Sequence, residues 1–317
     1  MDKELNLPLI TEKIALLRNN IKKHIKGKDN VINYCLCALF SGGHVLIEDI
    51  PGVGKTTLAY TIASSINLEF SRIQFTSDLL PADIIGVSVY DQKTNEFDFK
   101  SGPIFANIVL ADEINRTTPK TQSALLEAMN ESCVTVDGKS YDLPRPFMVI
   151  ATQNPFEYHG TFPLPESQLD RFSIKLNMGY PDLQSEKSIL SNHHSSTYKE
   201  EVNPVLDIGD LNQIKTLVQN VHIEEEVLDY ILSIVNKTRD NEQFDLGISP
   251  RGAIILKNLS MANAVVDNRT YVTPDDVKKM VIPAFSHRVV LKAGPNSHGK
   301  NENEVLTNLL KDIKVPI

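Results

Sequence analysis

A glycine-rich run near residue 50 carries the most specific chemistry in the sequence. Residues 52–57 read GVGKTT, between an apolar run at 44–48 and a segment of helical spacing at 56–66. Glycines let backbone N–H groups approach phosphate oxygens, and a helix that begins there adds a field favourable to anions. Lys55 can reach the β- and γ-phosphates, and the Thr56 hydroxyl can ligate Mg²⁺. We therefore predict a nucleotide-binding loop of Pro51, Gly52, Val53, Gly54, Lys55, Thr56 and Thr57.

The loop departs from the usual motif at one position. Its first glycine would fall at residue 49, which is Asp49 here. A chance glycine loop at a strand–helix junction is the alternative. The strand–helix context and the motifs that follow in order favour phosphate binding.

Two acids follow a buried strand further along the chain. Residues 108–111 are apolar, and Asp112 and Glu113 come directly after them. Asp112 can hold Mg²⁺ through water, as a second predicted metal ligand beside Thr56, and Glu113 can polarise the attacking water. Taken alone, such acids are more often ordinary solvated side chains. Behind a phosphate-binding loop, the catalytic interpretation is favoured.

Asn154 follows another predicted strand, 147–152. Its side-chain amide can orient the attacking water near the γ-phosphate. The alternative is a turn residue, because Asn-Pro pairs are common in turns. The position at the end of a core strand favours a catalytic role.

Two arginines are candidates for contacts to phosphate. Arg171 follows PESQLD, and an arginine at the end of a short helix can reach the γ-phosphate of a neighbouring subunit, worth about 10³–10⁵ in rate. A local ion pair with Asp170 or Glu166 is the alternative. Arg251 falls in the first turn of a predicted helix, where the helix dipole disfavours a cation and an anionic partner would compensate. A solvated arginine is the alternative there.

Composition limits the class of protein. The 317 residues are 41% hydrophobic with a net charge of −8, which argues against nucleic acid as a partner. The first ten residues lack the features of a signal peptide, and the most apolar stretch, 31–40, is too short to span a bilayer. The three cysteines have no metal-site spacing and are expected to be reduced thiols. We predict a cytoplasmic protein with no membrane span.

The pattern of elements predicts two domains. Helical segments at 3–24 and 29–41 come first, and a helix over 118–131 and a hairpin turning at Asp137-Gly138 lie between later strands. Five strands are expected, at 44–48, 70–75, 107–111, 147–152 and 172–176. Residues 78–104 are interpreted as a short helix broken by an extended insert. Helical periodicity dominates after 178–181, so we predict an α/β domain with a parallel five-stranded sheet between helices, followed by a smaller all-helical lid domain.

These motifs, in this order, resemble the MoxR family of AAA+ ATPases. The matching runs are EDIPGVGKT, LADEINRT, QSALLEAMNESCVTVDG, ATQNP, PLPESQLDRF and ISPRG, and the resemblance covers about residues 5–290. Asp49 is normal for this family, whereas Ser132 and Cys133 replace residues that are more often charged. These two departures put no catalytic role in doubt.

The resemblance implies a role for each site residue. Lys55 and Thr56 correspond to Walker A, and Asp112 and Glu113 to Walker B. Asn154 matches sensor 1, Arg171 the arginine finger and Arg251 sensor 2, while Gly27 matches the segment that lines the adenine pocket and Arg116 is a second candidate to contact a neighbour. The implied domains are 1–178, with a helix-2 insert at about 83–104 and a pre-sensor-1 hairpin at about 133–146, and 181–317.

The resemblance also implies an activity and partners. It implies an enzyme that hydrolyses ATP with Mg²⁺ at the subunit interfaces of a homo-oligomeric ring, expected to be a hexamer. Family members resemble chaperone-like ATPases that act with von Willebrand factor A domain proteins, often in metal cofactor insertion or complex maturation. The client and the pathway stay open.

Three alternatives remain at this stage. A GTP switch needs a guanine-reading NKxD motif, and the nearest match, 236–239, has arginine in place of aspartate. A nucleotide-dependent scaffold without turnover is disfavoured by the intact Glu113 and Asn154. A DNA-handling relative is weakly disfavoured by the acidic charge.

Overall fold

The protein is described by a computed structural model, which covers residues 7–157, 160–192, 202–292 and 301–316. Its centre is a parallel sheet in the order β2-β5-β8-β1-β9. The strands are β1 (Val45–Glu48), β2 (Phe70–Gln74), β5 (Ile108–Asp112), β8 (Met148–Gln153) and β9 (Ile174–Leu176). The five predicted strands and the parallel fold class are confirmed.

The pairing register brings the ends of the three central strands to one edge of the sheet. Ile150 of β8 pairs with both Leu110 of β5 and Val45 of β1. Parallel strands that share a register also end together, so the loops after β1, β5 and β8 meet at the carboxyl edge. These strands are buried along almost their whole length, which explains their nearly continuous apolar sequence.

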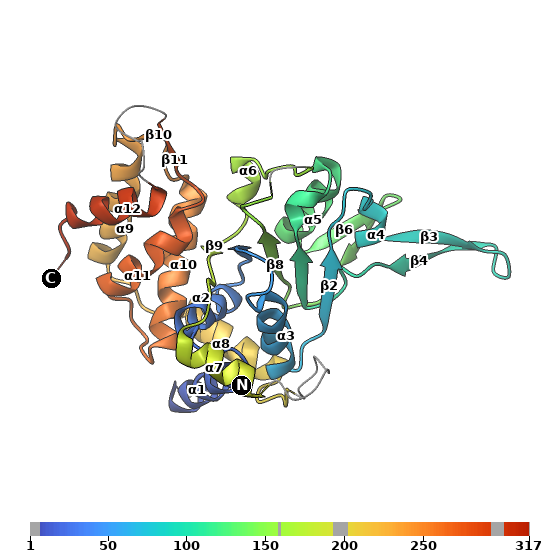
Figure 1. Cartoon of the computed structure of the whole chain (residues 1–317), viewed down its shortest axis with the longest axis horizontal. Helices are drawn as coiled ribbons and strands as arrows, with labels where there is room; N and C mark the ends of the chain where they lie inside the picture. The colour runs from blue at the N-terminus through green and yellow to red at the C-terminus, as the bar shows by residue number, and fades with distance from the viewer. Residues whose placement is uncertain (1–6, 158–159, 193–201, 293–300, 317) are drawn as a thin grey trace.

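Helices cover both faces of the sheet (Figure 1). On one face Ile108 and Leu110 join the apolar side chains of α1 (Leu7–His24), α2 (Asp29–Phe40) and α3 (Lys55–Ser65). On the other, Val109 and Ala111 pack with α4 (Pro81–Ile85) and α5 (Pro119–Glu131). Successive residues of a strand point to opposite faces, so one short run supplies two cores.

The expected helix with an extended insert is a short helix followed by a hairpin. After α4, β3 (Gly86–Asp91) pairs antiparallel with β4 (Glu96–Ser101), and the pair projects away from the sheet (Figure 1). Gly86 allows the base of the hairpin to close, because a Cβ there would lie 2.2 Å from the carbonyl oxygen of Lys100. The predicted second hairpin is also present, as β6 (Cys133–Val136) and β7 (Lys139–Asp142), with positive φ at Asp137 and Gly138.

The C-terminal part is mainly helical, as predicted. Its helices are α7 (Leu183–Asn192), α8 (Ile208–Gln219), α9 (Glu225–Arg239), α10 (Pro250–Val266), α11 (Pro274–Phe285) and α12 (Glu302–Lys311). It also contains a short antiparallel ribbon, β10 (Phe244–Leu246) with β11 (Val290–Leu291). The prediction of an all-helical domain did not include this ribbon.

The helical part shares its apolar core with one face of the sheet. Side chains of α8, α10 and α11 belong to the same hydrophobic cluster as those of α1, α2 and α3. The place at which the chain divides into domains therefore stays a prediction. Within the described ranges, no helix is both long and apolar enough to cross a membrane.

Candidate active site

The glycine loop lies at the carboxyl edge and leads from β1 into α3. Gly52 and Gly54 have φ of 85° and 93°, a region that glycine enters without steric cost. In the described part of the chain, no hydrogen bond takes the backbone N–H groups of Gly52, Val53, Gly54 and Lys55. These donors, with the first turn of α3, form a cradle for an anion.

Lys55 is largely buried beneath this loop. Only 9% of the residue is exposed, and its Nζ donates to the backbone oxygen of Asp49 at 2.8 Å. Burial lowers the pKa of Lys55 below its ordinary value, while the nearby carboxylates of Asp112 and Asp49 act in the opposite direction. A buried ammonium of this kind is stabilised further when a phosphate binds next to it.

Asp49, which replaces the first glycine of the usual motif, makes two hydrogen bonds that hold the loop in place. Its Oδ1 accepts from the backbone N–H of Ile50 at 2.8 Å, and its Oδ2 accepts from the N–H of Gly179 at 2.5 Å. The carboxylate therefore ties the phosphate-binding loop to the segment that leaves β9 for the helical domain.

The two acids after the apolar run of β5 are joined by one hydroxyl. Thr152, at the end of β8, donates to Oδ1 of Asp112 at 2.7 Å and accepts from the N–H of Glu113 at 2.8 Å. Oδ2 of Asp112 accepts from Arg72 at 2.7 Å. Sequence reasoning missed Thr152 and Arg72. Thr152 is the last residue but one of β8 and Arg72 is the middle residue of β2, so their use depends on which strands are neighbours.

Glu113 is held by side chains on both sides. Its Oε2 accepts from Gln74 at 2.8 Å and from Arg116 at 3.0 Å. Gln74 ends β2 and lies opposite Asp112 in the register. Arg116 therefore contacts Glu113 of its own subunit in this structure, and its predicted contact to a neighbour stays untested.

Asn154 completes the group at this edge and is 7% exposed. Its Oδ1 accepts from the N–H of Phe156 at 3.1 Å, which fixes the amide in a turn. Its NH₂ group has no hydrogen-bond partner among the described residues. The amide can therefore donate to a water or a phosphate oxygen.

The residues at this edge fit a nucleotide with Mg²⁺. Within the described ranges the Thr56 hydroxyl makes no hydrogen bond, and no cluster of three His, Cys, Asp or Glu side chains forms a closed metal site. Mg²⁺ in nucleotide sites takes one or two protein ligands, with phosphates and water completing the shell. Thr56 and Asp112 are the ligands that this edge offers.

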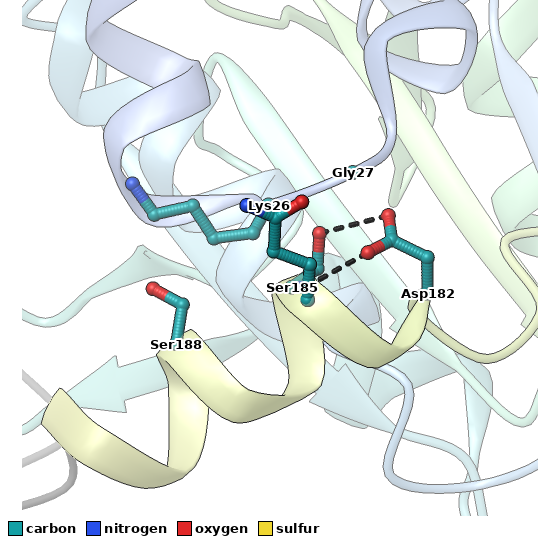
Figure 2. A pocket seen from close by; sticks show the side chains of 6 residues that line it. Lys26, Gly27, Asp182, Ser185 and Ser188 are labelled. Atoms are coloured by element: carbon teal, nitrogen blue, oxygen red, sulfur yellow. Dashed lines mark hydrogen bonds between the residues drawn. The ribbon is translucent and has the colours of Figure 1, made fainter.

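Gly27 lies in the turn between α1 and α2, beside the start of α7 (Figure 2). With Lys26, Asp182 and Ser185 it lines an open cavity of about 300 Å³. Two hydrogen bonds from Ser185, at 2.8 and 2.9 Å, hold the pKa of Asp182 below its usual range. Gly27 has φ of 66°, a conformation that favours glycine, and a Cβ there would also lie 2.6 Å from Oγ of Ser185.

Arg171 and Arg251 lie away from the glycine loop, and both contact the C-terminal half of α5. Nη1 of Arg171 donates to the backbone oxygen of Leu126 at 2.5 Å, and Nη2 of Arg251 donates to Oδ1 of Asn130 at 3.0 Å. Arg171 follows α6 (Glu166–Leu169) and shortly precedes β9, whose first residue, Ile174, pairs with Val45, the first residue of β1. Both arginines are therefore associated with the amino edge of the sheet, opposite the glycine loop.

This placement separates the predicted site residues into two groups. Strand β1 spans four residues, or about 13 Å at about 3.3 Å per residue, between the two edges. Lys55, Asp112, Glu113 and Asn154 come together, and the two arginines do not join them within one chain. The suggested ion pair of Arg171 with Asp170 is absent from the described contacts, because Asp170 pairs with Arg288.

A phosphate-binding loop, an acid pair and a polar strand-end residue on a five-stranded parallel sheet, followed by a helical lid, define the class of AAA+ ATPases. The guanine-reading alternative has no support, since residues 236–239 lie within α9 and Arg239 donates to the backbone oxygen of Ile248.

Comparison with known proteins narrows the class. Residues 44–174 match the model of the ATPase family associated with various cellular activities (AAA), and residues 236–309 match the AAA lid domain. The uncharacterized protein YeaC of Bacillus subtilis is 47% identical, covering 94% of this chain and 93% of its own. Chaperone MoxR1 of Mycobacterium tuberculosis is 38% identical, covering 93% and 80%. The crystal structure of a predicted ATPase from Cytophaga hutchinsonii superposes with a TM-score of 0.91 at 35% identity, covering 98% and 97%.

This chain belongs to the MoxR family of AAA+ ATPases.

Proposed function

We propose that the protein hydrolyses ATP with Mg²⁺ at the interfaces of a homo-oligomeric ring, and that turnover drives remodelling of partner proteins. The observation that carries this proposal is the separation of the two groups. The carboxyl edge holds residues that bind phosphate and activate water, and the amino edge holds Arg171 and Arg251. A second copy that places its amino edge against the carboxyl edge of the first would complete the site.

Each residue of the carboxyl edge has a role that follows from its contacts. Lys55 places its ammonium beside the β- and γ-phosphates, and Glu113 accepts the proton of the attacking water. Asn154 orients that water through its NH₂ group, which has no partner among the described residues. Thr56 and Asp112 would hold Mg²⁺, which would supply neutralisation of the phosphate charge. Gly27 contributes the wall against which the adenine lies.

The amino edge supplies the missing positive charge. Arg171 lines a second open cavity of about 340 Å³ with Ser123, Glu127 and Asn130 of α5. In a ring, Arg171 would leave its hydrogen bond with Leu126 and approach the neighbour's γ-phosphate. The contribution expected of such a residue is about 10³–10⁵ in rate.

A mixing experiment tests this arrangement. Glu113→Gln and Arg171→Ala should each bind ATP but release little phosphate, because each lacks one half of the composite site. Mixed together, they should regain activity, since Arg171→Ala supplies an intact carboxyl edge and Glu113→Gln supplies the arginine. Lys237→Ala removes an exposed charge on α9 and serves as the control. Wild-type turnover in isolated Arg171→Ala would overturn the proposal.

The biological role is proposed with its own test. The name of Chaperone MoxR1 supports a chaperone-like action on partner proteins, and the family resemblance extends this to a von Willebrand factor A domain partner, metal cofactor insertion, a hexameric ring and a cytoplasmic location. Glu113→Gln should bind ATP without hydrolysing it and should keep partner proteins bound, whereas Lys55→Ala should release them. If no partner protein copurifies with Glu113→Gln, the proposed biological role is contradicted.

A scaffold that binds nucleotide without turnover is the alternative. It would be favoured if the assembled wild-type protein bound ATP and Mg²⁺ but released no phosphate. The same outcome would remove the catalytic roles of Glu113 and Asn154.

A further inference from the structure

Residues 170–173 form a short connection that carries Arg171 from α6 into β9. One residue of the helical domain, Arg288, which follows α11, makes four hydrogen bonds to this connection. Arg288 is far from Arg171 in the sequence, and nothing in the motifs of the chain pointed to it.

The guanidinium of Arg288 holds the backbone on both sides of Arg171. Its Nε donates to Oδ1 of Asp170 at 2.7 Å, and its Nη2 donates to the backbone oxygens of Asp170 at 2.9 Å and Phe172 at 2.5 Å. Nη1 lies 3.4 Å from the backbone oxygen of Ser173 and also contacts the backbone oxygen of Ala284 and Nε2 of His287. Three backbone oxygens of this connection thus share one arginine.

Burial makes this contact specific. Arg288 is 5% exposed, and burial lowers the pKa of its guanidinium to about 10, while Asp170 acts in the opposite direction. The side chain therefore stays charged at neutral pH. A charge removed from water is tolerated only where its hydrogen-bond geometry is satisfied, so the connection has little freedom to shift relative to the helical domain.

The same cluster includes the beginning of α10, which carries Arg251. Oγ of Ser249, the N-cap of α10, lies 3.4 Å from Oδ2 of Asp170. A Cβ on Gly252 would lie 3.2 Å from Cδ of Arg288, so α10 packs closely against the same side chain. The segments that carry Arg171 and Arg251 are therefore joined through Asp170, Ser249 and Arg288.

We propose that Arg288 is a positioning residue that, through Asp170 and the backbone of 170–173, fixes the position of Arg171 relative to the helical domain. The proposal rests on the proposed function, because it assigns Arg288 to the half of the composite site that one subunit lends to another. Movement of the helical domain is then transmitted to the arginine presented to the neighbour.

The test uses the full chain and the variant Arg288→Met, which keeps much of the apolar stem and removes the donors. It should bind ADP with wild-type affinity, since its own carboxyl edge is intact. It should lose ATP turnover by at least about tenfold, because a displaced arginine gives up part of the about 10³–10⁵ in rate expected of it. Mixed with Glu113→Gln, it should regain activity as Arg171→Ala does. A merely structural defect would not be repaired by a neighbour.

Two further variants separate a loss of positioning from a loss of stability. Arg269→Met breaks a comparable bidentate pair with the buried Asp276 inside the helical domain, and it should lower thermal stability without a loss that mixing repairs. Asp170→Asn tests the same cluster with a smaller change if Arg288→Met does not fold.

The two ideas fail in different ways. Full turnover in Arg288→Met, or in Asp170→Asn where the first does not fold, overturns the positioning role and leaves the proposed function in place. Lost turnover that mixing with Glu113→Gln does not restore also overturns it. If Arg171→Ala itself turns over ATP at the wild-type rate, the proposed function fails.

Discussion

Thr152 shows how a single buried hydroxyl can set the geometry of a catalytic edge. The residue has no exposed surface, and its Oγ bridges Oδ1 of Asp112 and the backbone N–H of Glu113. Glu113 has a positive φ of 58°, a conformation that costs energy for a residue with a side chain. The hydroxyl of Thr152 therefore stabilises a strained turn at Glu113, the residue that we propose activates the water.

Thr152→Val should remove this bridge while keeping the shape of the side chain. The N–H of Glu113 loses its partner, so we expect a loss of about 1–3 kcal/mol in the free energy of unfolding. Turnover should fall as well, because Glu113 is no longer fixed. Urea denaturation and phosphate release measure the two effects. Thr121→Val, which removes a buried hydroxyl that donates to the backbone of Leu79, is the control and should affect stability alone.

His44, at the amino edge, should make stability depend on pH. Its Nδ1 accepts from the N–H of Val149 at 3.0 Å, which leaves Nε2 to donate to the backbone oxygen of Met129 at 3.0 Å. Burial lowers the pKa of His44 to about 4, so the folded protein keeps the ring neutral. The unfolded chain protonates the ring near its ordinary pKa of about 6.5. Stability is therefore fully present above that pH and is lost as the pH falls toward 4.

The expected slope is about 1.4 kcal/mol per pH unit for each such histidine. The pKa of buried His287 is lowered in the same direction, chiefly by burial, so it adds to the slope. Urea unfolding at several pH values between about 7.5 and about 5 should show a shallower dependence for His44→Gln than for the wild type. Equal slopes for His44→Gln and the wild type would contradict the assignment.

Among the elements, α10 begins with residue types that favour the start of a helix. Ser249 is its N-cap, with Oγ accepting from the N–H of Gly252 at 3.1 Å, and Pro250 is its first residue. The same hydroxyl contacts Asp170 of the sheet domain, so this cap joins two parts of the chain. No pattern in the sequence indicates that second contact.

Ser249→Ala should therefore have two effects. Loss of the cap is expected to cost about 1 kcal/mol in the free energy of unfolding. Turnover should also fall, since Asp170 loses a partner beside Arg171. Asp207→Ala removes the N-cap of α8, which accepts from the N–H of Asp210, and is the matched control. It should lose similar stability and keep its turnover; equal effects of the two variants on turnover would argue against the coupling.

Elements with strong local signals were predictable. The apolar runs of β1, β5 and β8 and the Asp137-Gly138 turn are confirmed, because burial on both faces and positive φ each demand particular residue types. The ribbon of β10 and β11 was missed because its strands have only three and two residues and pair across most of the helical domain. Long-range pairing of such short strands leaves no local pattern.

The residues of the candidate site also separate into those that the sequence could predict and those that it could not. The glycine loop and the acids have a characteristic spacing, so Lys55 and Glu113 could be named from the sequence. Gln74 and Arg288 could not, since each is a lone polar residue whose use depends on which segments become neighbours. Sheet order and domain packing decide that, and neither can be read from periodicity.

At the scale of the whole molecule, the two edges of the sheet present complementary chemistry. The carboxyl edge offers Lys55 and backbone N–H groups that have no partner among the described residues, and the amino edge offers Arg171 and Arg251. One chain cannot fold its amino edge back onto its own nucleotide, because the strands of the sheet lie between them. Contact between copies is the direct way to bring the two groups together.

Turnover per chain should consequently rise steeply with protein concentration. Dilution separates the copies, and each isolated chain then lacks the arginine that stabilises the transition state, so phosphate release per chain should fall toward the level of Arg171→Ala. Light scattering on the same dilution series, with Glu113→Gln holding ATP, should show assembly over the same range of concentration. The Arg171→Ala variant should show low activity at every concentration. A turnover per chain that stays constant on dilution, while light scattering shows the particles dissociating to single chains, would mean that each chain completes its own site.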